Sequence, residues 1–272
     1  MKILDELKSA GFDFKKSLGQ NYLLDEGFLG SLVKNLGLKQ NETVVEVGTG
    51  AGTFTRAIAR KVGMVKTFEV DKRLESVLQK QFEGLTNIEL RFEDGLKSDN
   101  MPNELYKVVA NIPYYITTPL LMKFMRDPNC IEINVLVQEE FGNRMVTLHG
   151  CGEYGALSVG VQSWGDVEII KWVPRNMFVP RPNVDSVFVQ VKKHDKYDNV
   201  DATSLEKLLK GLFSSRRKMI TNGLGKVLGI NREEVIKILY NIGIDENLRP
   251  EDISVEQYIA LSNLLSSMNY KL

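Results

Sequence analysis

The 272-residue chain is poor in cysteine and histidine, with two of each. The cysteines, Cys130 and Cys151, lack the spacing of metal ligands, and so do the histidines, His149 and His194. A chain of this length buries a core large enough to be stable without disulfides. We therefore expect reduced thiols in an intracellular protein and no bound metal.

Long hydrophobic runs are also missing near the N-terminus. The first 23 residues, MKILDELKSAGFDFKKSLGQNYL, alternate charged and apolar side chains. They contain no uninterrupted apolar segment of the length that a signal peptide or a membrane span requires. We expect a cytoplasmic protein that has no membrane partner, and the absence of a long apolar stripe favours a monomer.

Neither sign of charge is in excess, because 35 basic and 35 acidic side chains balance. The total charge therefore says nothing about a polyanionic partner, and such evidence must come from local clustering. One cluster is Lys210–Arg232, KGLFSSRRKMITNGLGKVLGINR, with six basic residues and no acidic one. This segment predicts phosphate contacts; the alternative is the solvated face of an ordinary helical domain.

Short β-branched runs alternate with amphipathic segments from Thr43 onward, which is the pattern of βαβ units. Five runs predict a doubly wound, largely parallel sheet: TVVEV (43–47), MVKTFEV (64–70), NIELRF (87–92), KVVANI (107–112) and INVLV (133–137). Helical periodicity follows in Lys72–Phe82, Pro119–Arg126 and Glu139–Leu148. DVEIIKWV (166–173) and DSVFVQVKK (185–193), joined by a proline-bearing loop, predict an antiparallel pair at the sheet edge.

The pattern changes after His194, where the polar stretch KYDNVDATS precedes a segment that is helical in pattern and has few strand signals. We place a domain boundary near residue 196. The prediction is an α/β domain over residues 1–195 and a small all-helical domain over 196–272.

Glycines occupy the turn between the first predicted strand and a helix, in the order Gly48, Gly50 and Gly52. Glycine at such a turn lets the backbone approach a ligand closely. Thr53 stands where G-x-G-x-x-G would have its third glycine, and no Gly-Lys-Ser/Thr ending follows, so a dinucleotide fingerprint and a P-loop are both disfavoured. A tight strand-to-helix turn without a ligand is the structural alternative.

Carboxylates end the next two predicted strands. Glu69 lies about twenty residues after the glycines, where a carboxylate accepts hydrogen bonds from both hydroxyls of a ribose. Asp94, after the third strand, can accept from an adenine amino group, or it is a solvated turn residue. Because the carboxyl ends of parallel strands share one edge, the loop and both acids predict an adenosine site there.

The stretch NIPYYITTP (111–119) follows the fourth strand. Asn111 and Pro113 can accept the two hydrogens of an adenine amine through the amide oxygen and the backbone carbonyl, which aims the nitrogen lone pair at a methyl donor. Proline fixes the turn, and Tyr114 offers a face for the base to stack on. The structural alternative is a strand end closed by a turn proline, with tyrosines in the core.

A second aromatic, Phe178 of FVPRPNVDS (178–186), is expected on the same rim. Two rings can hold one base between them, and such stacking offsets part of the cost of taking the base out of its stack. A proline-stiffened hairpin with a core phenylalanine is the alternative.

Six segments resemble, in order and at the usual spacing, the motifs of the small-subunit (16S) ribosomal RNA adenine N6,N6-dimethyltransferase family, which is associated with kasugamycin sensitivity. They are KKSLGQNYL, EVGTGAGTFT, NIPYYITTP, FVPRPNVDS, LFSSRRKMITNGL and LRPEDIS. The resemblance implies a Rossmann-like methyltransferase sheet with a small helical C-terminal domain, and S-adenosylmethionine as co-substrate. It further implies dimethylation of two adjacent adenosines in a hairpin near the 3′ end of 16S rRNA, and a role in small-subunit biogenesis.

The same resemblance implies roles for single residues. Contacts to the methyl donor would come from Asn21, Leu23, Gly48, Gly50, Glu69, Asp94 and Asn111. Asn111, Pro113 and Tyr114 would form the catalytic loop, and Phe178 would stack on the target adenine. The basic segment, with Arg216, Arg217 and Lys218, would bind RNA. Tyr115 departs from the asparagine of many members and places a bulkier side chain near a once-methylated amine; dimethylation is still expected.

Three other functions remain open at this point. Large-subunit methyltransferases of the macrolide-resistance type share the catalytic loop, although SSRRKMITNGL and LRPEDIS favour the small-subunit branch. A ribosome-assembly factor with incidental catalysis would use the basic domain. An NAD-dependent oxidoreductase would rest on the glycine loop and Glu69 alone, and it leaves NIPYY unexplained.

Overall fold

The computed structural model describes residues 2–9, 12, 21–197 and 200–270. The chain divides into two compact units, residues 1–142 with 168–192 and residues 143–167 with 193–272. The main part of the second unit starts at Lys193, close to the predicted boundary, but the unit also takes in 143–167, which the sequence assigned to the first domain. Tyr154 and Val159 of this segment are buried in the core of the second unit, which explains the difference.

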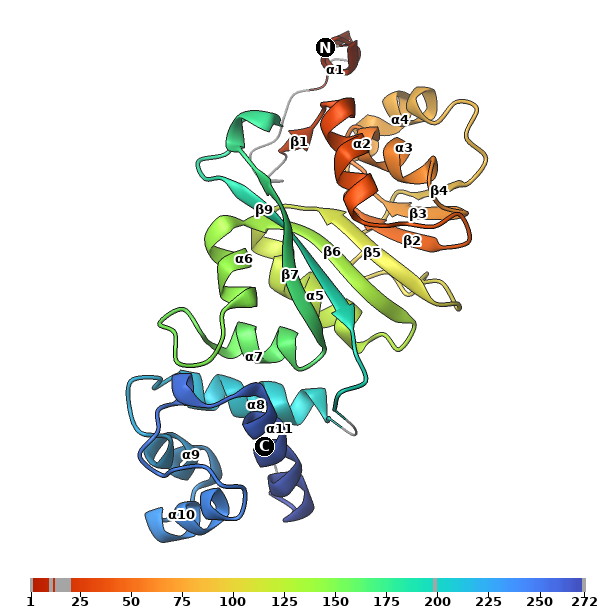
Figure 1. The fold of residues 1–272 in the computed structure, drawn as a ribbon. Coiled ribbons are helices and arrows are strands. Elements are labelled where there is room, and N and C mark those ends of the chain that lie inside the picture. Colours follow the sequence, from red (N-terminus) through yellow and green to blue (C-terminus); the bar gives the residue numbers. More distant parts are fainter. Residues whose placement is uncertain (1, 10–11, 13–20, 198–199, 271–272) are drawn as a thin grey trace. The chain divides into compact units, whose positions relative to one another are not determined.

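A seven-stranded sheet with the order β4-β3-β2-β5-β6-β9-β7 forms the centre of the first unit (Figure 1). Its strands are β2 (Thr43–Val47), β3 (Met64–Phe68), β4 (Ile88–Arg91), β5 (Tyr106–Asn111), β6 (Cys130–Gln138), β7 (Gly165–Val173) and β9 (Ser186–Lys193). The neighbouring strands β4, β3, β2, β5 and β6 are parallel to one another, whereas β9 is antiparallel to β6. The predicted α/β fold is confirmed, with β7 at the edge beside β9.

Helices connect these strands and bury their apolar faces on the sheet. They are α2 (Glu26–Asn35), α3 (Thr53–Ala59), α4 (Glu75–Gln81), α5 (Thr117–Arg126) and α6 (Glu139–Val146), with short 3₁₀ turns η2 (Lys72–Leu74), η3 (Tyr114–Ile116) and η4 (Arg175–Met177). Leu29 and Leu32 of α2 and Ile58 of α3 are fully buried in one cluster with strand residues such as Val44 and Val109. Figure 1 shows α2 and α3 beside the β2–β4 half of the sheet.

A second, two-stranded sheet joins distant parts of the chain. β1 (Tyr22–Leu23) pairs antiparallel with β8 (Phe178–Val179), so that Tyr22 faces Val179 and Leu23 faces Phe178. The short helix α1 (Lys2–Ser9) contributes Ile3 and Leu7 to a cluster that includes Tyr22. The N-terminal segment is thereby tied to the main sheet's loops.

The second unit is helical apart from the first residues of β7 and the last residue of β9. It contains α7 (Ala156–Gln162), α8 (Ala202–Phe213), α9 (Ile220–Leu228), α10 (Arg232–Tyr240), η5 (Pro250–Asp252) and α11 (Val255–Ser267). Asp201, Asn231 and Ser254 cap three of these helices by accepting from backbone N–H groups, which explains where the helices begin. No helix within the described ranges is both long and apolar enough to span a membrane.

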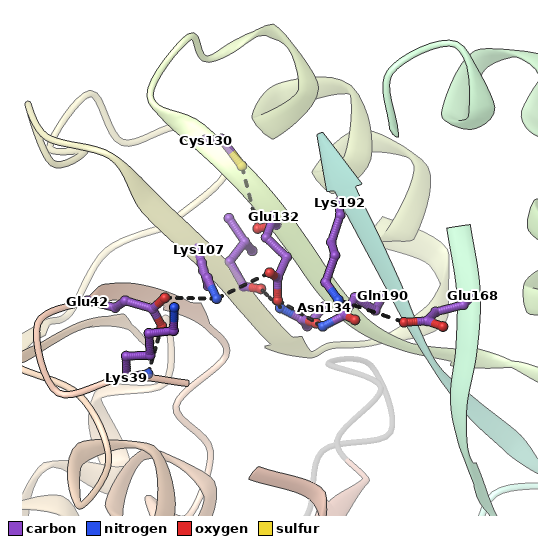
Figure 2. Close-up of polar contacts among 10 residues, drawn as sticks. Lys39, Glu42, Lys107, Cys130, Glu132, Asn134, Glu168, Gln190 and Lys192 are labelled. Atoms are coloured by element: carbon purple, nitrogen blue, oxygen red, sulfur yellow. Dashed lines mark hydrogen bonds and ion pairs between the residues drawn. The ribbon is translucent and has the colours of Figure 1, made fainter. Parts of the chain in front are cut away.

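A buried polar cluster lies near the amino ends of the central strands (Figure 2). The Lys107 ammonium on β5 lies 3.0 Å from Glu42 and 3.2 Å from Glu132 on β6. Asn134 and Gln190, on β6 and β9, each donate to the other Glu132 oxygen at 2.9 Å. Because every charge here has partners, the cluster connects β5, β6 and β9 without leaving a buried charge uncompensated.

Replacing Lys107 by methionine is expected to lower the free energy of unfolding by about 3 kcal/mol, because the buried Glu132 carboxylate and the partly buried Glu42 carboxylate then lose their cation. Urea unfolding measures the effect. The matched control is Lys192→Met, since Lys192 is 56% exposed and pairs with Glu168 only at 3.9 Å. This control should cost less than about 0.5 kcal/mol, and equal losses in the two variants would contradict the interpretation.

Candidate functional site

The sheet order locates the site. Strand β2 has β3 on one side and β5 on the other, so the chain reverses direction across the sheet between β2 and β5. Ligands of open α/β sheets bind outside the carboxyl ends of the strands at such a switch point. A cavity of about 200 Å³ lies there, and eight predicted residues line it: Asn21, Leu23, Gly48, Gly50, Glu69, Asp94, Asn111 and Pro113.

The glycine loop after β2 adopts a backbone that other residues would strain. Gly48, Gly50 and Gly52 have φ values of 86°, 55° and 78°, in the left-handed region. A Cβ on Gly50 would lie 3.0 Å from the Tyr22 ring. The loop is also anchored to β3, because the Phe68 carbonyl accepts from the N–H groups of Gly48 and Thr49 at 2.9 and 3.2 Å.

Glu69 joins the end of β3 to this loop. One carboxylate oxygen accepts from the Gly50 N–H at 2.8 Å and the other from the Asp71 N–H at 2.9 Å. Burial raises the pKa of Glu69, and these two backbone donors counteract the rise. A carboxylate offers about four acceptor positions, so it retains capacity for two hydroxyl groups of a ligand in the cavity.

Asp94 lies on the cavity wall after β4 and is more exposed than Glu69. One of its oxygens accepts from the Leu96 N–H at 3.0 Å, and the other lies 3.6 Å from the Lys97 ammonium. Asp94 follows β4, which is the third strand predicted from the sequence. Its position agrees with the prediction that the carboxyl ends of these strands meet at one site.

Asn111 is the last residue of β5, and its amide is oriented by the backbone. The amide nitrogen donates to the Asn21 carbonyl at 3.3 Å, which leaves the amide oxygen as an acceptor at the cavity. The Pro113 carbonyl accepts from the Ile116 N–H at 3.1 Å and keeps one lone pair. Two acceptors of this kind can hold the two hydrogens of an exocyclic amine.

The two predicted stacking rings do not line the cavity. The Tyr114 hydroxyl shares a 2.8 Å hydrogen bond with the Ser186 hydroxyl, and burial raises its pKa. Phe178 is only 3% exposed and belongs to the core cluster, where β8 pairs it with Leu23. Four other aromatic rings line the cavity: Tyr22, Phe54 and Phe68, which are buried, and Tyr115, which is 68% exposed.

Sequence reasoning missed other cavity residues, among them Thr49, Val70, Glu93, Leu96 and Tyr115. Val70 is 57% exposed although it is apolar. Most of them adjoin a predicted site residue at a strand end, so extending the prediction by one residue would have found them.

A buried carboxyl group supports the glycine loop from β2. One Glu46 oxygen accepts from the hydroxyls of Thr55 and Thr67 at 2.6 and 2.7 Å. The Thr49 and Thr67 hydroxyls are 2.6 Å apart, so hydrogen bonds run from Glu46 to the cavity wall. Burial raises the pKa of Glu46 to about 8, against the lowering effect of the two threonine donors.

Glu46→Gln is expected to change how stability depends on pH. Because the folded-state pKa lies above the unfolded value, this group's contribution to stability is fully present below about pH 4.5 and is lost as pH rises through about 8. The variant lacks this ionisation. Between pH 5 and 9, the free energy of unfolding of the wild type should therefore fall by on the order of 3 kcal/mol relative to that of the variant. Urea unfolding across this range measures the difference, and parallel profiles would contradict it.

The predicted RNA-binding residues lie in the turn between α8 and α9, and all three are exposed. Arg216 donates to the Gly152 carbonyl at 3.0 Å and lies 3.6 Å from Glu251. Arg217 and Lys218 form no ion pair with any described residue. Within the same part of the chain, no three His, Cys, Asp or Glu side chains converge as metal ligands, and the metal-free site stays a prediction.

The fold, with a cavity at its switch point, is that of an α/β enzyme of the Rossmann-like methyltransferase class. The chain belongs to the ribosomal RNA adenine dimethylase family, whose model matches residues 11–267. It is therefore an S-adenosylmethionine-dependent rRNA adenine methyltransferase, as predicted, and the oxidoreductase alternative is wrong.

Relatives and solved structures agree with this assignment. A ribosomal RNA small subunit methyltransferase A from Clostridioides difficile (strain 630) is 38% identical over 94% of this chain and 92% of its own. One from Bacillus cereus (strain B4264) is 36% identical, with coverages of 96% and 94%. A dimethyladenosine transferase from Plasmodium falciparum shares the fold at a TM-score of 0.82, with 23% identity and coverages of 91% and 98%. The 23S rRNA methyltransferase ErmE shares the fold at a TM-score of 0.71, with 25% identity over 90% of this chain and 100% of its own.

Proposed function

We propose that this enzyme dimethylates the N6 amines of two adjacent adenosines in a hairpin near the 3′ end of 16S rRNA. It acts in the cytoplasm as a monomer on the small subunit or its precursor, as a step of small-subunit biogenesis, and uses no metal. The observation that carries the chemistry is that Asn111 lines the cavity while its amide nitrogen donates to the Asn21 carbonyl, which leaves the amide oxygen as an acceptor. The names of the two bacterial relatives support the small subunit as substrate.

The β2–β4 side of the cavity binds the methyl donor in this proposal. Glu69 accepts from the ribose hydroxyls and Asp94 from the adenine amino group. Gly48 and Gly50 let the backbone approach the ligand, and Asn21 and Leu23 close the wall opposite. S-adenosylmethionine supplies a methyl group on a positively charged sulfur.

Asn111 and Pro113 bind the target amine at the other side of the cavity. Their oxygens accept its two hydrogens, so that the nitrogen lone pair is available for attack. As the nitrogen–carbon bond forms, the carbon–sulfur bond breaks, the sulfur keeps the electron pair, and a proton leaves the nitrogen for water. No strong base is needed, and orientation supplies much of the rate.

In this proposal Tyr114 stacks on the target adenine. Phe178 stacks on the other face of the base only if its ring moves out of the core. Tyr114 belongs to the loop that carries both acceptors, and Ser186 fixes its ring. Phe178 reaches a base only if it leaves the core, which its pairing opposite Leu23 opposes.

Asn111→Ala is expected to lower kcat by about 100-fold or more, because one acceptor for the amine is removed, while binding to small subunits is retained. The assay is methylation of purified, unmodified small subunits, followed by mapping of the modified nucleotides. Wild type should modify two neighbouring adenosines near the 3′ end. Modification of large-subunit RNA instead would support the macrolide-resistance type, and full activity in the variant would overturn the role of Asn111.

RNA affinity is expected to depend on Arg217 and Lys218 more than on Arg216, which Glu251 partly neutralises. The double variant Arg217→Ala with Lys218→Ala should weaken binding to small subunits. The slope of log affinity against log salt concentration should become shallower by about 1 for each phosphate that the variant no longer binds. The control is Lys237→Ala on α10, where Glu233 and Glu234 lie within one helical turn. An unchanged salt slope in the double variant would contradict this role for the turn.

A further inference from the structure

Tyr115 differs from the other aromatic residues around the site. It lines the cavity, yet 68% of it is exposed, and it makes no hydrogen bond or ring contact with any other described residue. Tyr114, one position earlier, is held by Ser186, and Phe178 is buried. An exposed ring of this kind on the wall of a binding cavity has its faces available to a ligand.

The local backbone separates the two tyrosines. Tyr114 and Tyr115 are the first two residues of the 3₁₀ turn η3, in which successive side chains point about 120° apart. Tyr114 turns toward the start of β9, where Ser186 holds it, and Tyr115 consequently turns outward. Tyr115 follows Pro113 by two positions, so their Cα atoms lie within about 8 Å. Tyr115 therefore lies on the exposed part of the cavity wall, close to Pro113.

We propose that Tyr115 stacks on the base next to the adenosine that is being methylated. This inference rests on the proposed function, in which two adenosines are adjacent. When one adenosine leaves the stack to reach Asn111, its neighbour loses a stacking partner. Tyr115 replaces that partner and offsets part of the unstacking cost, because aromatic rings in proteins stack favourably on any base.

Because Tyr115 touches the neighbouring base and not the reacting amine, it acts on substrate binding. Removing its ring should raise KM and leave kcat nearly unchanged. Because the RNA strand runs in one direction, the neighbour on the side of Tyr115 is an adenine for only one of the two targets, and the contact acts on methylation of that target. The contact is made to the flat face of the base and not to its hydrogen-bonding edge. A purine, with two fused rings, overlaps the tyrosine ring over a larger area than a pyrimidine does, so the contact favours purines.

The test compares wild type, Tyr115→Ala and Tyr115→Phe on two sets of unmodified small subunits. In one set both adenosines are present; in the other, uridine replaces the neighbour of the mapped target. On the natural pair, Tyr115→Ala should lower kcat/KM about tenfold through KM, as expected for one stacked base, and Tyr115→Phe should stay within about twofold of wild type. On the uridine-containing subunits, the loss in Tyr115→Ala should shrink to less than about threefold. Tyr240→Ala, which removes an 83% exposed tyrosine in the other unit, is the control and should not distinguish the two sets.

Equal losses on both substrates, or no loss on the natural pair, would overturn the stacking role while leaving the proposed function intact. Failure of the wild type to methylate small subunits would instead refute the proposed function. A fall in kcat without a change in KM would place Tyr115 in the chemical step and likewise overturn the inference.

Discussion

The hydrogen bond between the Gly50 N–H and the Glu69 carboxylate is the contact on which the site depends. It ties the loop after β2 to the end of β3, and the Phe68 carbonyl adds two further bonds to the same loop. Glycine is required for this path for two reasons: φ at Gly50 is 55°, in the left-handed region, and a side chain there would meet the Tyr22 ring. Backbone geometry therefore fixes the loop on one side of the cavity, while apolar side chains such as Leu23, Val70 and Ile112 form much of the rest of its wall.

The sheet separates two kinds of buried polarity. At the carboxyl ends of the strands, Glu69 and Asn111 are each partly satisfied by backbone groups and keep acceptor capacity for ligands. Near the amino ends, Lys107 and Glu132 are satisfied by neighbouring side chains. The first arrangement suits binding, since unpaired acceptors are costly until a ligand fills them. The second suits a rigid scaffold.

Much of the fold and of the β2–β4 side of the cavity was predictable from sequence. Runs such as TVVEV and KVVANI are buried on both faces and read as parallel strands, and the glycine loop and Glu69 follow strand ends in order. The β1–β8 pair was not predictable, because two-residue strands carry no periodicity and Leu23 meets Phe178 only through the tertiary fold.

The orientations of the Tyr114 and Tyr115 rings could not be predicted from the sequence either. Tyr114 and Tyr115 are adjacent and chemically identical, and only the 3₁₀ turn decides which one is held by Ser186 and which one is exposed. Residues 143–167 belong to the second unit because Tyr154 and Val159 are buried with α8 and α11 residues, a core that forms only when distant helices meet.

The orientation of Asn111 rests on a main-chain oxygen, since Asn21 supplies its carbonyl and not its amide. Every amino acid offers that oxygen, so this contact places no selection on which side chain evolution keeps at position 21. The orientation of the Asn111 amide is in this respect set by the path of the main chain, which a comparison of related sequences does not reveal.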